Sequence, residues 1–270
     1  MAFSFFGGVH PKENKGYACD KAIQEFPEPD IVVIPMSQHI GAPCKPLVKM
    51  GDLVTVGQKI GDNEGLCVPV HASVSGKVKQ VAPKAHTGGS LVMSVVIEND
   101  GLYTLCESCQ PRADIDSLAP EDLIRIIREA GIVGMGGAAF PTHFKMSSGL
   151  GKVDYVIINA AECEPGLRHN MVQLEDAELC AKTVRGAEYC AEVANASKII
   201  FAVKKKNLSA IGVLKKAIEG KDNISIHLMP DIYPMGEERA VVRECLGIEL
   251  DPTKLPSAAQ ADVCNVETVL

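Results

Sequence analysis

Three glycines within four positions, followed by a lysine, could hold an anion. The segment of residues 134–142 begins with Gly134, Gly136 and Gly137, and Lys145 lies three residues after its end. Because glycine has no Cβ, the backbone N–H groups of such a run can crowd against one anion, and the nearby cation suits a phosphate. A glycine-rich turn that only joins a helix to the next element is the commoner case. The loop by itself leaves both interpretations open.

Three further segments place polar side chains where ligands often bind. Residues 159–166 follow an apolar run, residues 153–158, that predicts a buried strand, so their carboxylates lie at a strand's carboxyl end, the usual ligand position in open α/β sheets. Residues 233–238 end in two adjacent carboxylates at the start of a predicted helix, which the helix dipole alone would also explain. The last segment is residues 265–268. The candidate residues are Asn159, Glu162, Glu164, Tyr233, Gly236, Glu237, Glu238, Asn265 and Thr268.

These four segments, in this order, resemble the four flavin-contacting stretches of the NADH-binding subunit of respiratory complex I. The amino terminus narrows the resemblance, because residues 7–11 (Gly-Gly-Val-His-Pro) and 13–15 (Glu-Asn-Lys) are similar to the opening of the RnfC subunit of Rnf electron-transport complexes. The resemblance covers essentially all 270 residues. It implies an electron-entry module, an oxidoreductase subunit that moves hydride between NADH and FMN and passes electrons to iron–sulfur centres.

The resemblance also implies a role for each candidate residue, none of them a covalent or proton-transfer role. Gly134, Gly136, Gly137 and Lys145 would hold the phosphate and ribityl end of FMN. Asn159 would touch the ring edge, Glu162 and Glu164 would form a polar wall, Tyr233, Gly236, Glu237 and Glu238 would line the opposite side, and Asn265 and Thr268 would close the site. For NADH, Glu238 would contact nucleotide hydroxyls. Phe140 would stack on the adenine, although a plain core phenylalanine is an equal alternative.

The chain departs from the complex I pattern at three positions in these segments. Met135 replaces a basic residue, Ala161 an aspartate and Cys163 a serine. The changes at Ala161 and Cys163 are those expected of the RnfC family, and they remove polar contacts to the flavin. Cys163 lies beside two carboxylates, so we expect a raised thiol pKa and no nucleophilic role.

A non-enzymatic alternative is a scaffold related to the sodium-pumping quinone reductase family, in which a similar subunit keeps the architecture without using this flavin site. The presence of all four segments together with Lys145 favours the enzyme. On that interpretation the partners are NAD(H) and the other subunits of a membrane-bound complex, which would hold the protein peripherally at the cytoplasmic face of the membrane. The direction of electron flow and the coupling ion, sodium or proton, stay open.

Composition argues against other classes of function. The net charge is −7 without a basic block, and tryptophan is absent, which disfavours a nucleic-acid partner. No apolar stretch approaches the roughly 18 residues of a spanning helix, and the amino terminus lacks a signal-peptide pattern. We therefore expect no direct membrane span.

The ten cysteines are scattered, which predicts neither disulfides nor a metal site. Cys106 and Cys109 form a lone C-x-x-C, whereas a zinc site needs a second pair or histidines at ligand spacing. No C-x-x-C-x-x-C run is present, so we expect this chain to hold no iron–sulfur cluster. By the resemblance, 4Fe-4S clusters belong to a further carboxyl-terminal region, which makes this chain a truncated form of the family.

Short Val- and Ile-rich runs predict an all-β domain over residues 1–112. Residues 48–60 and 70–78 resemble the halves of a lipoyl or biotinyl barrel. Carrier domains bear a modifiable lysine on the hairpin between these halves, but residues 62–65 here are Asp-Asn-Glu-Gly. We therefore predict a structural barrel-sandwich without a swinging cofactor. The expected strands are residues 31–34, 53–56, 68–70, 78–81 and 91–97.

From residue 117 onward, helical and strand patterns alternate. Pro120 begins a helix with acidic residues in its first turn and Gly131 ends it. Such alternation predicts an α/β flavin- or nucleotide-binding domain with a mostly parallel sheet over residues 113–270. The expected strands are residues 153–158, 198–203 and 224–228, and the further helices are residues 174–194, 208–218 and 239–246.

Overall fold

The computed structural model of the protein describes residues 9–19 and 21–270. Its contacts divide the chain into two compact units. One unit is Ile23–Phe144, which we call the barrel unit. The other joins Lys145–Leu270 to the amino-terminal segment that ends at Ala22, and we call it the α/β unit.

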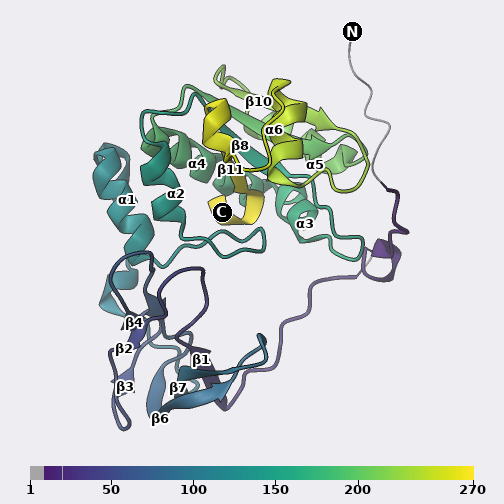
Figure 1. Ribbon diagram of the computed structural model, residues 1–270. Coiled ribbons are helices and arrows are strands. Elements are labelled where there is room, and N and C mark those ends of the chain that lie inside the picture. Colours follow the sequence, from purple (N-terminus) through teal and green to yellow (C-terminus); the bar gives the residue numbers. More distant parts are fainter. Residues whose placement is uncertain (1–8, 20) are drawn as a thin grey trace. The chain divides into compact units, whose positions relative to one another are not determined.

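The barrel unit is built on antiparallel strands, which confirms the predicted amino-terminal barrel-sandwich fold. Its two sheets have the strand orders β1-β7-β6-β3 and β2-β4-β5, and every strand pair in them is antiparallel (Figure 1). The unit also contains helix α1 (Pro120–Glu129), and the domain boundary near residue 112 stays a prediction. The strands are β1 (Ile31–Pro35), β2 (Lys45–Pro46), β3 (Leu53–Val54), β4 (Lys59–Asp62), β5 (Val70–His71), β6 (Gly76–Ala85) and β7 (Leu91–Asn99).

Side chains from both sheets form one apolar core in this unit. The long β6–β7 ladder supplies Val78, Val95 and Ile97, all fully buried. The ladder starts at Gly76, whose φ of +146° only glycine adopts readily, and a Cβ there would lie 1.9 Å from the carbonyl oxygen of Glu98. The other core members include Ile34, Met36, Cys44, Val54, Ile60, Cys67, Val70, Ala72 and Val74.

Two of the seven strands were not predicted, and the bounds of four others differ by two residues or more at one end: β3 ends at Val54, β5 begins at Val70, β6 spans Gly76–Ala85 and β7 ends at Asn99. The short strands β2 and β4 were not expected, because neither carries a run of β-branched residues. The run of residues 68–70 becomes a strand only at Val70, while Val68 lies in the preceding loop. There its carbonyl accepts a hydrogen bond from the Cys44 thiol, and its N–H points at the His39 ring. Polar contacts in the loop therefore replace the ladder at this residue.

The hairpin after β4 carries charge pairs in place of a carrier lysine. Asp62 accepts a hydrogen bond from Arg128 Nη2 of α1 at 2.8 Å, and its carboxylate lies 3.2 Å from Lys59 Nζ. Lys59 also pairs with Glu129. These pairs tie α1 to the hairpin, and the lack of a lipoyl or biotinyl group stays a prediction.

The α/β unit contains one four-stranded sheet in the order β10-β9-β8-β11, with every neighbour parallel (Figure 1). This confirms the predicted α/β fold. The outer strand β11 was not predicted, because Asp262, Cys264 and Asn265 interrupt its apolar pattern. The strands are β8 (Tyr155–Ala160), β9 (Lys198–Lys204), β10 (Ile224–Met229) and β11 (Ala261–Asn265).

Both faces of this sheet are covered, as a parallel sheet requires. Ile157, Ile200 and Val263 pack in one cluster with Val241 and Val242 of α6. The fully buried neighbours in the strands point to the other face, and α4 contacts both β8 and β9. The helices of this unit are α3 (His169–Glu175), α4 (Ala177–Ala194), α5 (Leu208–Ala217) and α6 (Glu238–Leu246), and α2 (Thr142–Gly149) joins the two units along the chain.

The single helix expected over residues 174–194 is two helices, with the break at Asp176. The Asp176 backbone is extended, with ψ of 126°, and its side chain accepts a hydrogen bond from Leu179 N at 2.8 Å. Aspartate is a favoured N-cap, so it starts α4 rather than continuing α3. Among the described residues, no helix is both long and apolar enough to cross a membrane.

One glycine in α4 tests how tightly this unit is packed. A Cβ at Gly186 would lie 1.6 Å from the carbonyl oxygen of Val269. We predict that Gly186→Ala lowers the free energy of unfolding by about 2 kcal/mol or more, since the overlap outweighs the roughly 1 kcal/mol gain in helix propensity. Thermal or urea unfolding measures the change.

Gly212 of α5 is the matched control, because a Cβ there would meet nothing within 4 Å. Gly212→Ala should raise the free energy of unfolding by about 0.5–1 kcal/mol through helix propensity and chain entropy. Equal stabilisation by both substitutions would contradict the packing of α4 against Val269.

Candidate functional site

The carboxyl ends of the four parallel strands lie along one edge of the sheet, and two predicted segments meet there. Strands β8 and β11 pair in register, so that Asn159 and Asn265 are direct neighbours at their ends. The chain turns after β8 into residues 161–166 and after β11 into the short helix η5 (Val266–Val269). The structure therefore brings the Asn-x-x-Glu-x-Glu and Asn-Val-Glu-Thr segments together.

Gly236 joins a third segment to the turn after β8. Its N–H donates to Cys163 Sγ at 2.7 Å, and its carbonyl accepts from Asn159 Nδ2 at 2.8 Å. The Asn159 side chain also accepts a hydrogen bond from Ala161 N at 3.1 Å. A Cβ at Gly236 would lie 2.8 Å from Cys163 Sγ, so a larger residue would force the two segments apart.

Glu162 is a buried carboxylate in an unusual backbone conformation. Its φ is +42°, and only 6% of the residue is exposed. Asn170 N donates to Oε1 at 3.1 Å, and Lys15 Nζ lies 3.8 Å from Oε2. Burial raises the pKa of Glu162, against the opposing effects of Lys15 and His169. A non-glycine residue in the left-handed region stores strain, which is frequent at ligand sites.

The amino-terminal segment packs against this edge rather than on the barrel strands. Val9 and Tyr233 exchange both backbone hydrogen bonds, at 3.1 and 3.0 Å. Lys15 Nζ donates to the carbonyls of Glu164, at 3.0 Å, and Leu167. The signature that pointed to the RnfC family thus contacts the predicted flavin segments, although Gly7 and Gly8 lie outside the described residues.

A cavity of about 110 Å³ lies between the amino-terminal segment and the strand ends. Its lining includes His10, Cys163, Lys204 and Tyr233. Ligand pockets usually have roughly 300–1,000 Å³, so this cavity is too small for a flavin. A larger hollow of about 420 Å³ runs along α6, and Glu237 is its one predicted site residue.

Lys145 and Glu238, predicted to serve different ligands, form an ion pair. Lys145 Nζ donates to Glu238 Oε1 at 2.8 Å and also to the backbone carbonyl of Val263 in β11. Burial opposes the charge of the ammonium, but the Cys264 thiol and the carboxylates of Glu238 and Asp262 raise the pKa of Lys145. The lysine is held as a cation beside the edge strand.

Asp262 is a buried carboxylate near that pair, and no sequence motif pointed to it. Among the described residues, its Oδ2 has no hydrogen-bond partner. A Cβ at Gly149 would lie 2.2 Å from this oxygen, so glycine is needed where α2 ends. Burial, with Glu238 adding to it and Lys145 opposing it, raises the pKa of Asp262 to about 6.

Two predicted site residues already serve as helix caps. Glu237 is the N-cap of α6, where Oε2 accepts from Arg239 N and Ala240 N, both at 3.1 Å. Asn265 caps η5 by accepting from Glu267 N at 2.9 Å. Both side chains therefore have a structural function that needs no cofactor.

The glycine loop belongs to the barrel unit. Gly134 N donates to the carbonyl of Phe140 at 2.8 Å, which closes the loop. Gly137 has φ of +125° and Ala139 has φ of +48°, while Gly136 and Gly137 are exposed. The Phe140 ring meets Phe144 edge to face at 6.5 Å between centroids, so this ring is at least partly a packing residue.

Cys163 has the raised thiol pKa that the sequence predicted, but the main cause differs. Burial is the largest contribution, and Glu164 adds a smaller one. The N–H of Gly236 and the ammonium groups of Lys204 and Lys15 oppose it. The thiol is therefore a hydrogen-bond acceptor at a segment junction rather than a nucleophile.

Sequence reasoning missed three polar residues of this unit: Lys15 and Asn170, which contact the turn after β8, and Asp262, near the amino end of β11. Lys15 belonged to a quoted motif but was given no role, since it is about 150 residues from its partners in the sequence. Asn170 lies in α3, and its buried Oδ1 has no partner among the described residues. Tyr233 is 40% exposed at the carboxyl edge of the sheet, and Thr268 lies in η5.

Comparison with known proteins defines the class of the chain. Residues 127–270 match the family model of the Nuo51 FMN-binding domain, which is more than half of the chain. Residues 3–102 match the RnfC barrel sandwich hybrid domain. The chain therefore belongs to the Nuo51 FMN-binding family, with the barrel domain of RnfC in front of it.

The curated relatives specify the match further. The chain is 39% identical over 98% of its length to the C subunit of the Na+-translocating ferredoxin:NAD+ oxidoreductase complex of Acetobacterium woodii, and covers 60% of that protein. It is 38% identical over its whole length to the C subunit of the proton-translocating ferredoxin:NAD+ oxidoreductase complex of Clostridium ljungdahlii, and covers 59% of it. The chain is a homologue of the RnfC subunit and spans about 60% of these relatives' length.

Solved structures agree with the fold. The H2-reduced crystal structure of an NAD+-reducing nickel–iron hydrogenase matches with a TM-score of 0.51 at 23% identity, over 60% of this chain and 32% of that chain. The air-oxidised structure matches with a TM-score of 0.50 at the same identity. At this identity the likeness concerns the fold alone.

The buried Asp262 predicts a dependence of stability on pH. Its folded-state pKa of about 6 exceeds the usual 3.8, so between these values the folded protein holds a proton that the unfolded chain has lost. The free energy of unfolding should therefore fall as the pH rises from about 4 to about 6, by about 3 kcal/mol from this group. Asp262→Asn should remove that fall, as urea unfolding at several pH values would show.

The exposed Asp222 provides the control. Asp222→Asn should leave the pH dependence of unfolding as in the wild type. If Asp262→Asn has the same pH profile as the wild type, the carboxylate is not buried in the way described.

Proposed function

We propose that this chain is the FMN- and NADH-binding electron-entry module of an Rnf-type ferredoxin:NAD+ oxidoreductase complex. The observation that carries the proposal is the junction of Asn159, Cys163 and Gly236 at the carboxyl edge of the parallel sheet, within a chain whose residues 127–270 match an FMN-binding family. Open α/β sheets bind ligands at this edge. The names of the relatives support the coupling to ferredoxin and NAD+.

Three groups of the chain fit the chemistry of FMN. Exposed backbone around Gly137, with open space where a Cβ would stand, suits a phosphate. The ammonium group of Lys145, which is held as a cation, complements the negative charge of that phosphate. The buried Oδ1 of Asn170, unpartnered among the described residues, is an acceptor of the kind that a flavin ring N–H requires. FMN, when bound, would accept hydride from NADH and release electrons singly.

The roles of the individual residues are part of the proposal. We assign Gly134, Gly136, Gly137 and Lys145 to the FMN phosphate and ribityl end, and Asn159, Glu162, Glu164 and Tyr233 to the surroundings of the ring. Gly236, Glu237, Asn265 and Thr268 would act by shaping the backbone around it, since Glu237 and Asn265 already cap helices. Glu162, kept in place by Asn170 N and Lys15, would keep one wall polar.

We assign Glu238 to NADH. The pairing with Lys145 uses its Oε1, so its second carboxylate oxygen is the proposed acceptor for nucleotide hydroxyls. In the absence of FMN, the Glu238 carboxylate would hold the Lys145 ammonium group in place, and the FMN phosphate would replace this carboxylate as its partner. Phe140 is proposed as an adenine contact, although its contact with Phe144 would occupy one edge of the ring.

The relatives' names support the proposed partners. We propose that the chain assembles with other subunits of an ion-translocating complex and reaches the cytoplasmic side of the membrane through them. Iron–sulfur centres of 4Fe-4S type in the complex would accept the electrons that FMN releases. The alternative, a scaffold without a functional flavin site, predicts that the chain binds no FMN.

The phosphate assignment is tested by FMN titration of the chain. We expect Lys145→Ala to weaken FMN binding by roughly 10- to 100-fold, since a hydrogen bond to a charged group contributes about 1.5–3 kcal/mol. The exposed Lys152→Ala is the matched control and should bind FMN as the wild type does. Equal affinity in all three proteins would reduce Lys145 to the partner of Glu238, and no binding in any would favour the scaffold.

The nicotinamide assignment is tested by stopped-flow bleaching of bound flavin with NADH. Glu238→Gln should retain FMN, because the change releases Lys145 from its ion pair. It should slow bleaching at low NADH by roughly tenfold, because the charged acceptor for the nucleotide is lost. Glu249→Gln, in the hollow along α6, serves as the control. Slower bleaching with Glu249→Gln but not with Glu238→Gln would place the nucleotide in that hollow instead.

A further inference from the structure

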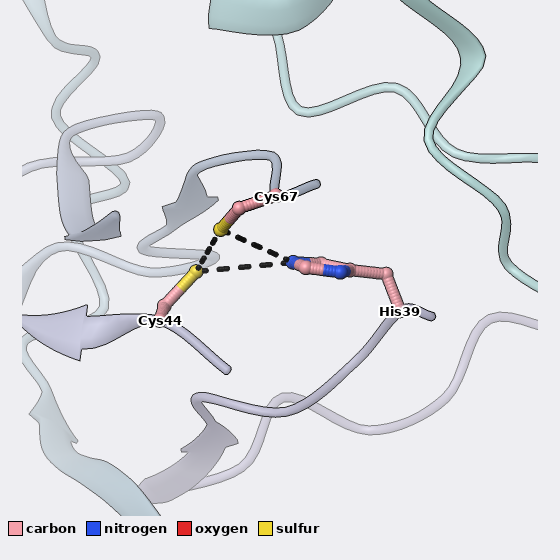
Figure 2. Close-up of side chains that lie close together, drawn as sticks. All are labelled: His39, Cys44 and Cys67. Carbon is pink, nitrogen blue, oxygen red and sulfur yellow. Dashed lines mark hydrogen bonds between the residues drawn. The ribbon is translucent and has the colours of Figure 1, made fainter. Parts of the chain in front are cut away.

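A histidine and two cysteines converge in the barrel unit, away from the predicted flavin segments in the sequence. His39 Nε2 lies 3.9 Å from Cys44 Sγ and 3.6 Å from Cys67 Sγ, and the two sulfur atoms are 3.5 Å apart (Figure 2). Both cysteines are buried and His39 is half-buried. We propose that His39, Cys44 and Cys67 form a zinc-binding site that fastens two loops of the barrel to each other.

The distances between the three ligand atoms are close to those expected around a tetrahedrally coordinated zinc ion. With Zn–S of about 2.3 Å and Zn–N of about 2.0–2.1 Å, tetrahedral ligands place two sulfurs about 3.8 Å apart and a sulfur and a nitrogen about 3.6 Å apart. The observed separations of 3.5, 3.6 and 3.9 Å bracket these values. An iron–sulfur cluster of the [2Fe–2S] or [4Fe–4S] type does not fit, because it takes four protein ligands and the group found among the described residues has three.

The histidine is already in the tautomer that a metal ligand needs. Its Nδ1 lies 3.1 Å from the carbonyl oxygen of Ile40, which can only accept, so Nδ1 carries the proton. The N–H of Val68 points at Nε2 from 3.4 Å, which agrees with a lone pair on that atom. A backbone carbonyl on the second ring nitrogen is the usual outer partner of a metal-bound histidine.

The backbone holds the two loops together independently of the three side chains. Ala42 N donates to the carbonyl of Leu66 at 2.9 Å, and Cys44 N donates to the carbonyl of Met36 at 2.8 Å. A Cβ at Gly41, whose φ is +121°, would lie 2.0 Å from the Leu66 carbonyl oxygen. Because the loops are fixed at this close approach, the ligands are arranged before an ion arrives.

Binding of Zn2+ would release one proton from each thiol, so that the ion and two thiolates form a neutral centre with the neutral imidazole. Among the described residues, these three side chains form the group whose possible metal-ligating atoms all lie within 4.8 Å of one another. A water molecule or another small ligand would complete the tetrahedron. The bound ion would join the loop between β1 and β2 to the loop between β4 and β5, and its fourth position would be open to exchange.

The test is a titration of the whole chain with Co2+ and then Zn2+ under a reducing phosphine. We expect one equivalent of Co2+ to give thiolate charge-transfer absorption, and one equivalent of Zn2+ to remove it and raise the melting temperature. Cys44→Ser and Cys67→Ser should each weaken Zn2+ binding by roughly 100-fold or more, which exceeds the effect of losing an outer-shell partner. The double variant Cys106→Ser/Cys109→Ser is the matched control and should bind like the wild type.

Several results would overturn the proposal. These are absence of charge-transfer absorption in the wild type, the same affinity after loss of Cys44 or Cys67, or loss of binding in the Cys106/Cys109 control. Mass spectrometry that finds a Cys44–Cys67 disulfide in place of bound metal would do the same. If a cysteine variant does not fold by circular dichroism, His39→Ala replaces it, with the same expected loss of affinity.

Discussion

The approach of Gly236 to the turn after β8 is the constraint on which the predicted site depends. Both backbone groups of this glycine are engaged, one by Cys163 Sγ at 2.7 Å and one by Asn159 Nδ2 at 2.8 Å. A Cβ on this glycine would lie 2.8 Å from Cys163 Sγ. Since α6 begins two residues later, at Glu238, the same contact fixes the position of Glu238. It thereby also fixes the position of the ion pair between Glu238 and Lys145.

Burial of charge is the second physical feature of the α/β unit. Glu162 and Asp262 are carboxylates with raised pKa values, each next to a lysine that offsets part of the cost of burial. Buried ionisable groups with specific partners are frequent at functional sites, although structural networks also produce them. Glu162 follows the carboxyl end of β8 in a chain of an FMN-binding family, which favours a functional interpretation for this residue. Asp262 is the second residue of β11 and lies toward the amino ends of the strands.

Much of the fold could be predicted from local patterns, and the exceptions have identifiable causes. The inner strands followed from apolar runs, and the helix starting at Pro120 from its position and first-turn acids. Strand β11 was missed because Asp262 interrupts its pattern, and one helix became two because Asp176 is an N-cap. In the site, the candidate segments could be found from motifs. Long-range contacts such as that of Lys15 with the turn after β8, or the cluster around His39, leave no periodic signal in the sequence.

Hydrogen–deuterium exchange of the chain with and without FMN tests the central claim most directly. The account predicts slower exchange on FMN addition in residues 159–164 and 233–238, where the Gly236 junction lies, and in the glycine loop of residues 134–140. Residues 39–67 of the barrel should exchange as before. Protection confined to residues 239–252 along α6, or unchanged exchange at the strand ends while FMN is bound, would contradict it.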